Sequence, residues 1–132
     1  MFSEKMKRER AVVAGGSIAG KLAAKALSNF FNEVIVIEKD KNAEQISKRK
    51  SVTQSAHGHV LLKSGEEILE EFFPGIIEEL SQKGAKKSDF AGDLVWSHHG
   101  SQKVRFDSKV FISQQSRTLL ESQIQKRLEK VS

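Results

Sequence analysis

The chain has 132 residues, the size of one ordinary domain or of a portion of a larger one. Its composition, with 38% hydrophobic and 30% charged residues, is typical of a folded globular protein, and the absence of cysteine excludes a disulfide scaffold, a thiolate metal site and a cysteine nucleophile. The formal net charge is +5, but the basic residues are interleaved with acids and the chain has no tyrosine, so we expect a solvated surface and no nucleic-acid partner.

Residues 1–10 form a basic tail in which four side chains are Lys or Arg. No apolar stretch of signal-peptide length follows this tail. The first apolar run, residues 11–20, contains three glycines and is too short to cross a bilayer. We therefore expect a soluble, cytoplasmic protein without a membrane span.

The segment after the tail has the pattern of a strand, a helix and a second strand. Residues 10–14 form a short, largely apolar run that glycines follow, which predicts a buried strand. Between residues 18 and 31 apolar side chains recur at spacing four, which predicts a helix. Residues 34–37 are all apolar, as in a parallel strand buried on both faces. Together they predict a βαβ unit with a right-handed crossover, and hence an α/β fold.

The middle of the chain predicts a polar loop and two short helices. Residues 39–53 are too polar to fill a core. Ser64 and Glu67 match a capping box, and the helix behind it is expected to bury Ile68, Leu69, Phe72 and Phe73 before Pro74-Gly75 ends it. A second helix follows, with Ile76, Ile77 and Leu80 inward and Gly84 at its C-terminal cap.

The last third predicts a small β-rich part and a final helix. Residues 94–96 and 104–106 flank a His-Gly-Ser turn, which indicates a hairpin, and residues 110–112 are expected to add a strand. Trp96 is expected to lie in the core. Residues 116–131 have the spacing of an amphipathic helix, with Thr118 and Glu121 as a second candidate capping box.

The glycine-rich turn between the first strand and the first helix carries the most chemical information. Its sequence, Val-Val-Ala-Gly-Gly-Ser-Ile-Ala-Gly over residues 12–20, supplies Gly15 for a tight turn and Gly20 for close helix packing. Ser17 stands where the dinucleotide-binding fingerprint has its second glycine. Its Cβ narrows the approach of a phosphate, while its hydroxyl can donate a hydrogen bond to one.

An acidic residue completes this pattern at the end of the second strand. Glu38 follows Gly15 by 23 residues, which places its carboxylate to accept the hydroxyls of an adenosine ribose and to repel a 2′-phosphate. The alternative is a βαβ unit whose glycines only make a tight turn. The four histidines, His57, His59, His98 and His99, have no acidic neighbours in sequence, so we expect no metal site.

Several segments resemble one family of enzymes. Residues 12–20 and 33–40 resemble the N-terminus of FAD-dependent monooxygenases of the aromatic-hydroxylase-like class. Residues 54–62 are similar to the Q-x-x-H-x-H-x-L-L stretch of a subgroup that includes polyether-type epoxidases. Residues 71–75 and 116–121 are similar to the same subgroup, so the resemblance covers nearly the whole chain after residue 10.

This resemblance implies a Rossmann-like FAD-binding domain of the glutathione-reductase type, interrupted by a β-rich insertion, with FAD as cofactor. In the family, a basic residue after the second strand, here Arg49, lies near the flavin, and Arg117 matches an arginine that contacts FAD from the start of a later helix. The implied cofactor-binding residues are Gly15, Gly16, Ser17, Ile18, Ala19, Gly20, Glu38, Lys39, Arg49, Gln54, His57 and Arg117.

The family's later Gly-Asp motif and its substrate pocket have no counterpart in this sequence. Residues 11–132 are therefore expected to be the N-terminal portion of an FAD-binding domain, an incomplete domain with an exposed sheet edge that favours self-association. The implied reaction of the full-length enzyme is oxygen transfer from O2 to a small organic substrate, with NADH or NADPH as reductant. The alternative is a non-catalytic, truncated dinucleotide-binding fragment.

Overall fold

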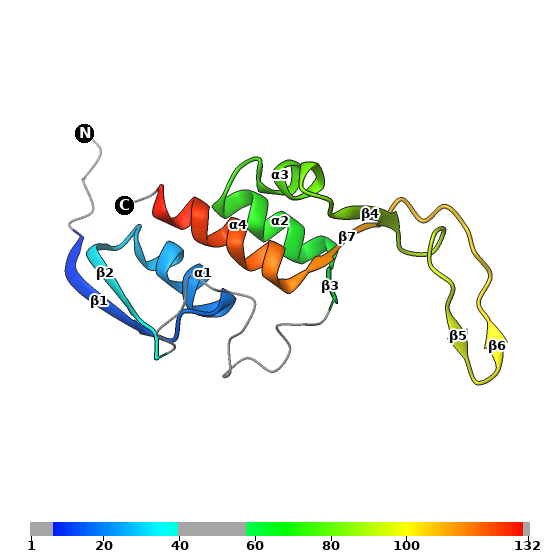
Figure 1. The fold of residues 1–132 in the computed structure, drawn as a ribbon, viewed down its shortest axis with the longest axis horizontal. Coiled ribbons are helices and arrows are strands. Elements are labelled where there is room, and N and C mark those ends of the chain that lie inside the picture. The colour runs from blue at the N-terminus through cyan, green and yellow to red at the C-terminus, as the bar shows by residue number, and fades with distance from the viewer. Residues whose placement is uncertain (1–6, 40–57, 131–132) are drawn as a thin grey trace.

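A computed structural model describes residues 7–39 and 58–130 of the chain (Figure 1). The fold is mixed α/β, with a parallel strand pair at one end, helices in the middle and a β-rich lobe at the other end. Three residues with predicted roles, Arg49, Gln54 and His57, lie outside the described residues. The elements in chain order are β1 (Arg8–Ala14), α1 (Ile18–Leu27), β2 (Phe31–Ile37), β3 (Gly58–Leu61), α2 (Lys63–Phe72), α3 (Ile76–Gln82), β4 (Lys86–Asp89), β5 (Ser97–His98), β6 (Ser101–Gln102), β7 (Phe111–Ser116) and α4 (Arg117–Glu129).

The first three elements form the predicted βαβ arrangement. Strands β1 and β2 pair in parallel, with Val12 opposite Ile35. Helix α1 is shorter than its sequence pattern predicts, because the Ser28 hydroxyl donates to the Lys25 carbonyl at 2.7 Å and the chain turns there. Phe31, placed at the helix end by the sequence pattern, is instead the first residue of β2.

The parallel sheet is incomplete within the described part of the chain. It has two strands, and Val12 and Ile37 remain 57% and 58% exposed. The expectation that these apolar strands are buried on both faces is therefore wrong for this structure, since a two-stranded parallel sheet cannot cover its own faces. The exposed apolar surface is the feature that motivates the expectation of self-association.

The centre of the molecule is a helical core laid against an antiparallel sheet. Strand β7 lies between β3 and β4, and α2, α3 and α4 surround the core (Figure 1). Strand β4 has the sequence Lys-Lys-Ser-Asp and carries no apolar alternation, so the sequence gives no signal for it. Ile68 is exposed on α2, contrary to prediction. The core consists of Leu69, Phe73, Ile76, Leu80, Ala85, Leu120 and Ile124.

The helix ends differ from the two predicted capping boxes. Helix α2 begins at Lys63 with Leu62 at the N-cap and no side-chain cap, so Ser64 and Glu67 do not form the box. Helix α4 is capped by Ser116, whose hydroxyl accepts from the Leu119 amide at 3.1 Å, rather than by Thr118. The predicted end of α3 is confirmed, because Gly84 adopts a φ of +100° there.

The β-rich part projects as a lobe formed by residues 90–110, here called the hairpin lobe (Figure 1). A hairpin turns at the predicted place, through His99 and Gly100 with positive φ angles, but the predicted strands at residues 94–96 and 104–106 are not formed. The ladder is limited to β5 and β6. Trp96 is exposed on this lobe and not in the core. In the segments that the structure describes, no helix is long and apolar enough to cross a membrane.

One carboxylate fastens the base of the hairpin lobe. Asp89 accepts hydrogen bonds from the amides of Gly92 and Ala91 on one limb, and from the amide and hydroxyl of Ser108 on the other. Burial raises the pKa of this carboxyl, but these hydrogen bonds outweigh burial and hold the pKa of Asp89 well below its usual value of 3.8. Because the ionised form is the one that the fold binds, ionisation of Asp89 stabilises the folded state.

Because the pKa of Asp89 is lowered in the folded state, part of the free energy of unfolding depends on pH. This stabilisation is fully present above pH 3.8, the value expected for the unfolded chain, and is lost as the pH falls toward the lower folded-state value. In Asp89→Asn, the free energy of unfolding should lack this dependence between neutral and acid pH. Urea titrations of both proteins at a series of pH values measure the difference, and parallel pH profiles would contradict the assignment.

Candidate functional site

The glycine-rich turn sits at the carboxyl end of the parallel strands. Gly15 has a φ of +101°, a conformation that side-chain-bearing residues rarely adopt, and its amide donates to the Ile37 carbonyl at 2.7 Å. A Cβ on Gly20 would lie 1.8 Å from the Gly15 carbonyl oxygen. The turn therefore needs glycine at both positions, for the two different reasons that the sequence predicts.

The carboxylate of Glu38 lies against this turn. Its Oε2 atom accepts a hydrogen bond from the Gly16 amide at 2.8 Å. A Cβ on Gly16 would be 3.0 Å from the same oxygen, so the third glycine of the turn allows the carboxylate to approach. The strand pairing explains this proximity, since Ala14 is opposite Ile37 and both strands end at the same edge of the sheet.

The first turn of α1 presents backbone amides without a side-chain cap. Ser17 occupies the N-cap with an extended backbone, and its side chain makes no capping hydrogen bond. Ile18 and Ala19 are the first helical residues. Uncapped amides at the positive end of a helix dipole favour an anion, and a phosphate is the anion that commonly fits such a turn.

A buried ion pair joins the first turn of α1 to α4. Lys21 Nζ lies 3.4 Å from Glu121 Oε1, and the two side chains are 4% and 0% exposed. Arg117, the first residue of α4, places its Nε 3.8 Å from the other oxygen of Glu121. Two cations from different helices therefore share one carboxylate, and the residue with the predicted flavin contact is held near the helix that follows the glycine turn.

The sequence pattern does not single out Lys21 or Glu121. Lys21 stands between the apolar positions Ile18 and Leu22, and a lysine there is usually read as a solvated residue. Glu121 was expected at a helix cap, but the structure buries it in the ion pair. In each of these two helices a charged residue interrupts an apolar stripe, and this interruption is the sequence signal for a buried ion pair. Sequence alone does not show which acid contacts which base.

Of the remaining candidate residues, one lies within the described residues and three lie outside them. Lys39 is the described one; it lies directly after Glu38 and is exposed. The roles assigned to Arg49, Gln54 and His57 fall on residues that the structure does not describe. Among residues 7–39 and 58–130, no group of three or more acids or histidines is arranged to hold a metal ion.

The arrangement can hold the diphosphate part of an adenine nucleotide. The glycine turn removes side chains from the approach, the helix amides offer donors, and Glu38 offers an acceptor for ribose hydroxyls at the neighbouring strand end. These three features lie together where β1 and β2 end and α1 begins. These features are typical of a nucleotide-binding turn.

No protein-family model matches the chain. Protein Rv3254 of Mycobacterium tuberculosis (strain ATCC 25618 / H37Rv) is 34% identical over 89 residues, which cover 67% of this chain and 19% of that protein. The chain therefore corresponds to about a fifth of the length of this curated relative.

Solved structures of 2-methyl-3-hydroxypyridine-5-carboxylic acid oxygenase have the same fold over nearly the whole chain. A tetrameric form superposes with a TM-score of 0.69 at 22% identity, and a mutant form with a TM-score of 0.67 at 24% identity. Each match covers 96% of this chain and 30% of the oxygenase chain. This chain thus has the fold of a part of that oxygenase.

Proposed function

We propose that the chain is the FAD-binding portion of a flavoprotein monooxygenase. The observation that carries the proposal is the contact between Glu38 and the Gly16 amide, beside a glycine turn and an uncapped helix N-terminus. The fold shared with an oxygenase and the sequence resemblance to FAD-dependent monooxygenases support it. The geometry and the sequence motifs concern the same edge of the sheet, and the fold comparison supports the proposal for the chain as a whole.

The residues of this chain would bind and orient the cofactor. The amides of Ile18 and Ala19 would donate to the diphosphate, with Ser17 adding its hydroxyl, and Glu38, positioned by the Gly16 amide, would accept from the adenosine ribose. Gly15 and Gly20 keep the turn close to α1. Arg117 would approach the cofactor from α4, with Lys39, Arg49, Gln54 and His57 as further contacts. When bound, FAD reduced by NADH or NADPH supplies the electrons for oxygen transfer from O2 to an organic substrate.

The finer parts of the proposal depend on sequence resemblance. The similarity of residues 54–62 to polyether-type epoxidases favours an epoxidation or hydroxylation of a small organic molecule. The chain matches 30% of the solved oxygenase chains, so a complete substrate site is proposed only for a longer protein or assembly that includes this part. Cytoplasmic location and self-association through the exposed strands remain proposals.

Binding of ADP and FAD to the Glu38→Ala variant tests the function. Loss of the carboxylate should weaken binding by about 1–3 kcal/mol, because a ribose–carboxylate hydrogen-bond pair is left unmade. Isothermal titration or fluorescence of FAD measures the affinity. The variant should also lose discrimination between AMP and adenosine 2′,5′-bisphosphate, which differ only in the 2′-phosphate that the carboxylate repels.

Glu33→Ala is the matched control. Glu33 lies on the same strand and is exposed, and it pairs with Arg10, so its removal changes the charge equally without touching the turn. The proposal predicts unchanged affinity for this control. If the unaltered chain binds neither ADP nor FAD and its melting temperature does not rise with either, the alternative of a non-binding fragment is supported instead.

A further inference from the structure

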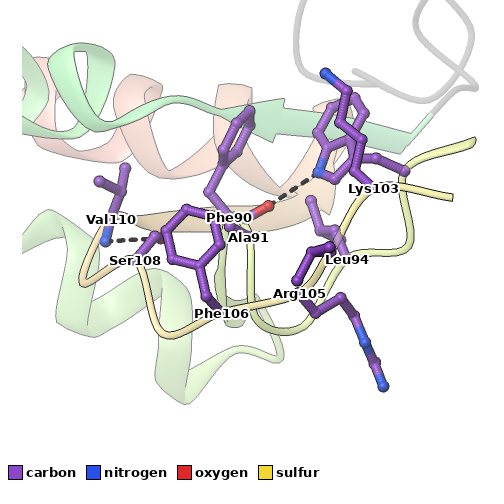
Figure 2. A pocket seen from close by; sticks show the side chains of 10 residues that line it. Phe90, Ala91, Leu94, Lys103, Arg105, Phe106, Ser108 and Val110 are labelled. Carbon is purple, nitrogen blue, oxygen red and sulfur yellow. Dashed lines mark hydrogen bonds between the residues drawn. The ribbon is translucent and has the colours of Figure 1, made fainter. Parts of the chain in front are cut away.

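The hairpin lobe contains an open pocket of about 340 Å³, formed between its two limbs (Figure 2). It lies at the opposite end of the molecule from β1 and β2, and so away from the glycine turn (Figure 1). Most of its lining is apolar or aromatic. The lining residues are Phe90, Ala91, Leu94, Trp96, Lys103, Val104, Arg105, Phe106, Ser108 and Val110.

The walls of this pocket are held in place by polar contacts. The Trp96 indole N–H donates to the Phe90 carbonyl at 3.0 Å, and the two rings lie 5.1 Å apart (Figure 2). Asp89 ties both limbs together at the base of the lobe through Gly92 and Ser108. A pocket with fixed aromatic walls loses little entropy when a ligand enters, which favours binding.

Some apolar side chains that line the pocket are largely exposed to solvent, which is unusual for apolar residues gathered in one place. Val104 is 85% exposed and Phe106 is 62% exposed. Exposed apolar side chains that are gathered on one lobe, rather than scattered, mark an interaction site. The pocket has the volume of a small-molecule site, at the lower end of the usual range of about 300–1,000 Å³.

The charged side chains that line the pocket are all positive. Lys103 and Arg105 contribute to its lining, and no acidic side chain does. Neither cation forms an ion pair with the acids of the described chain, whereas neighbouring Lys109 pairs with Asp107. Figure 2 shows the Lys103 and Arg105 side chains on the same limb of the lobe. The outer limb thus offers two available cations next to an apolar cavity.

We propose that this pocket binds a small ligand with an aromatic or aliphatic body and one anionic group, such as a carboxylate or sulfonate. The body fills the space between Phe90, Trp96 and Phe106, and the anion faces Lys103 and Arg105. This site is separate from the proposed cofactor site and does not depend on it. It gives the lobe a ligand-recognition role that the glycine turn does not supply.

The chain contains an internal reporter for this site, because Trp96 is its single tryptophan. The probe is 1-anilinonaphthalene-8-sulfonate, and its uncharged analogue N-phenyl-1-naphthylamine has the same aromatic body. Energy transfer from Trp96 to either dye reports binding at the lobe. The proposal predicts saturable binding of one dye per chain, with the sulfonate bound more tightly than the uncharged analogue.

Two variants separate the charge from the apolar wall. Lys103→Gln with Arg105→Gln should weaken sulfonate binding about fivefold or more and leave the uncharged dye unchanged, because only one dye carries a charge. Phe106→Ser should weaken both dyes, because it removes part of the wall. Lys83→Gln with Lys130→Gln changes the net charge equally outside the lobe and should affect neither dye.

Several results overturn the proposal. These are equal affinity for the two dyes, charge variants that bind like the unaltered chain, or dye binding without energy transfer from Trp96. A chain that elutes as a dimer and releases the dye on dimerisation also overturns it, because the lobe would then be an interface between copies. The melting temperature of each variant, measured without dye, shows that the fold is retained.

Discussion

Replacing Glu121 with glutamine should lower the free energy of unfolding by about 3–5 kcal/mol, the usual cost of breaking a buried ion pair from one side. The substitution keeps the shape of the side chain but removes the negative charge beside Lys21, which is 4% exposed. Arg117 loses the same carboxylate. Since folded domains are stable by about 5–15 kcal/mol, this single change should remove a large fraction of the total. Urea denaturation followed by circular dichroism measures it.

The double variant Lys21→Met with Glu121→Leu separates the effect of losing both charges from the effect of losing only one. Removing both charges and leaving apolar side chains of similar volume should restore most of the lost stability, because neither ion then has to be desolvated. Arg10→Met with Glu33→Gln is the control for an exposed pair, with side chains 62% and 52% exposed, and should change stability by about 1 kcal/mol or less. A loss below 1 kcal/mol for Glu121→Gln would show that the carboxylate is not required at the helix crossing.

The elements near the glycine turn could be predicted because their signals are local. The apolar run of β1, the glycines and the spacing of α1 lie within one short stretch, so local rules predict these elements. The position of Glu38 beside the turn could be predicted for the same reason, since parallel pairing brings the end of β2 next to the end of β1. The end of α3 at Gly84 is also local, because one positive φ determines it.

The remaining features depend on contacts between distant residues, which no local pattern encodes. Strand β4 has four polar residues and is a strand because β7 offers it an edge. The Lys21–Glu121 pair joins residues one hundred positions apart, and it explains why both charges are inside the molecule. Trp96 appeared to be a core residue by its type, yet its indole is held in an exposed lobe by a backbone carbonyl.

Gly20→Ala should be the most disruptive of the glycine-to-alanine changes in the described part of the chain. A Cβ at this position would lie 1.8 Å from the Gly15 carbonyl oxygen and 3.5 Å from the Val13 side chain. The obstacle is backbone, so it cannot rotate away, and α1 must move from the turn or the turn must open. Overpacking of this kind costs about 3 kcal/mol or more when backbone has to shift. The measurement is the free energy of unfolding from urea titration.

Gly65→Ala on α2 is the matched control, since it adds the same methyl group to another helical glycine. There the new Cβ would meet Leu61 Cδ1 at 2.8 Å, which is the end of a flexible side chain that can rotate. The gain in helix propensity from glycine to alanine, about 1 kcal/mol, then offsets the adjustment. We expect Gly65→Ala to be close to neutral and Gly20→Ala to be strongly destabilising. Equal losses in the two variants would mean that helix α1 is not packed on the turn through Gly20, and the geometry proposed for diphosphate binding would fail with it.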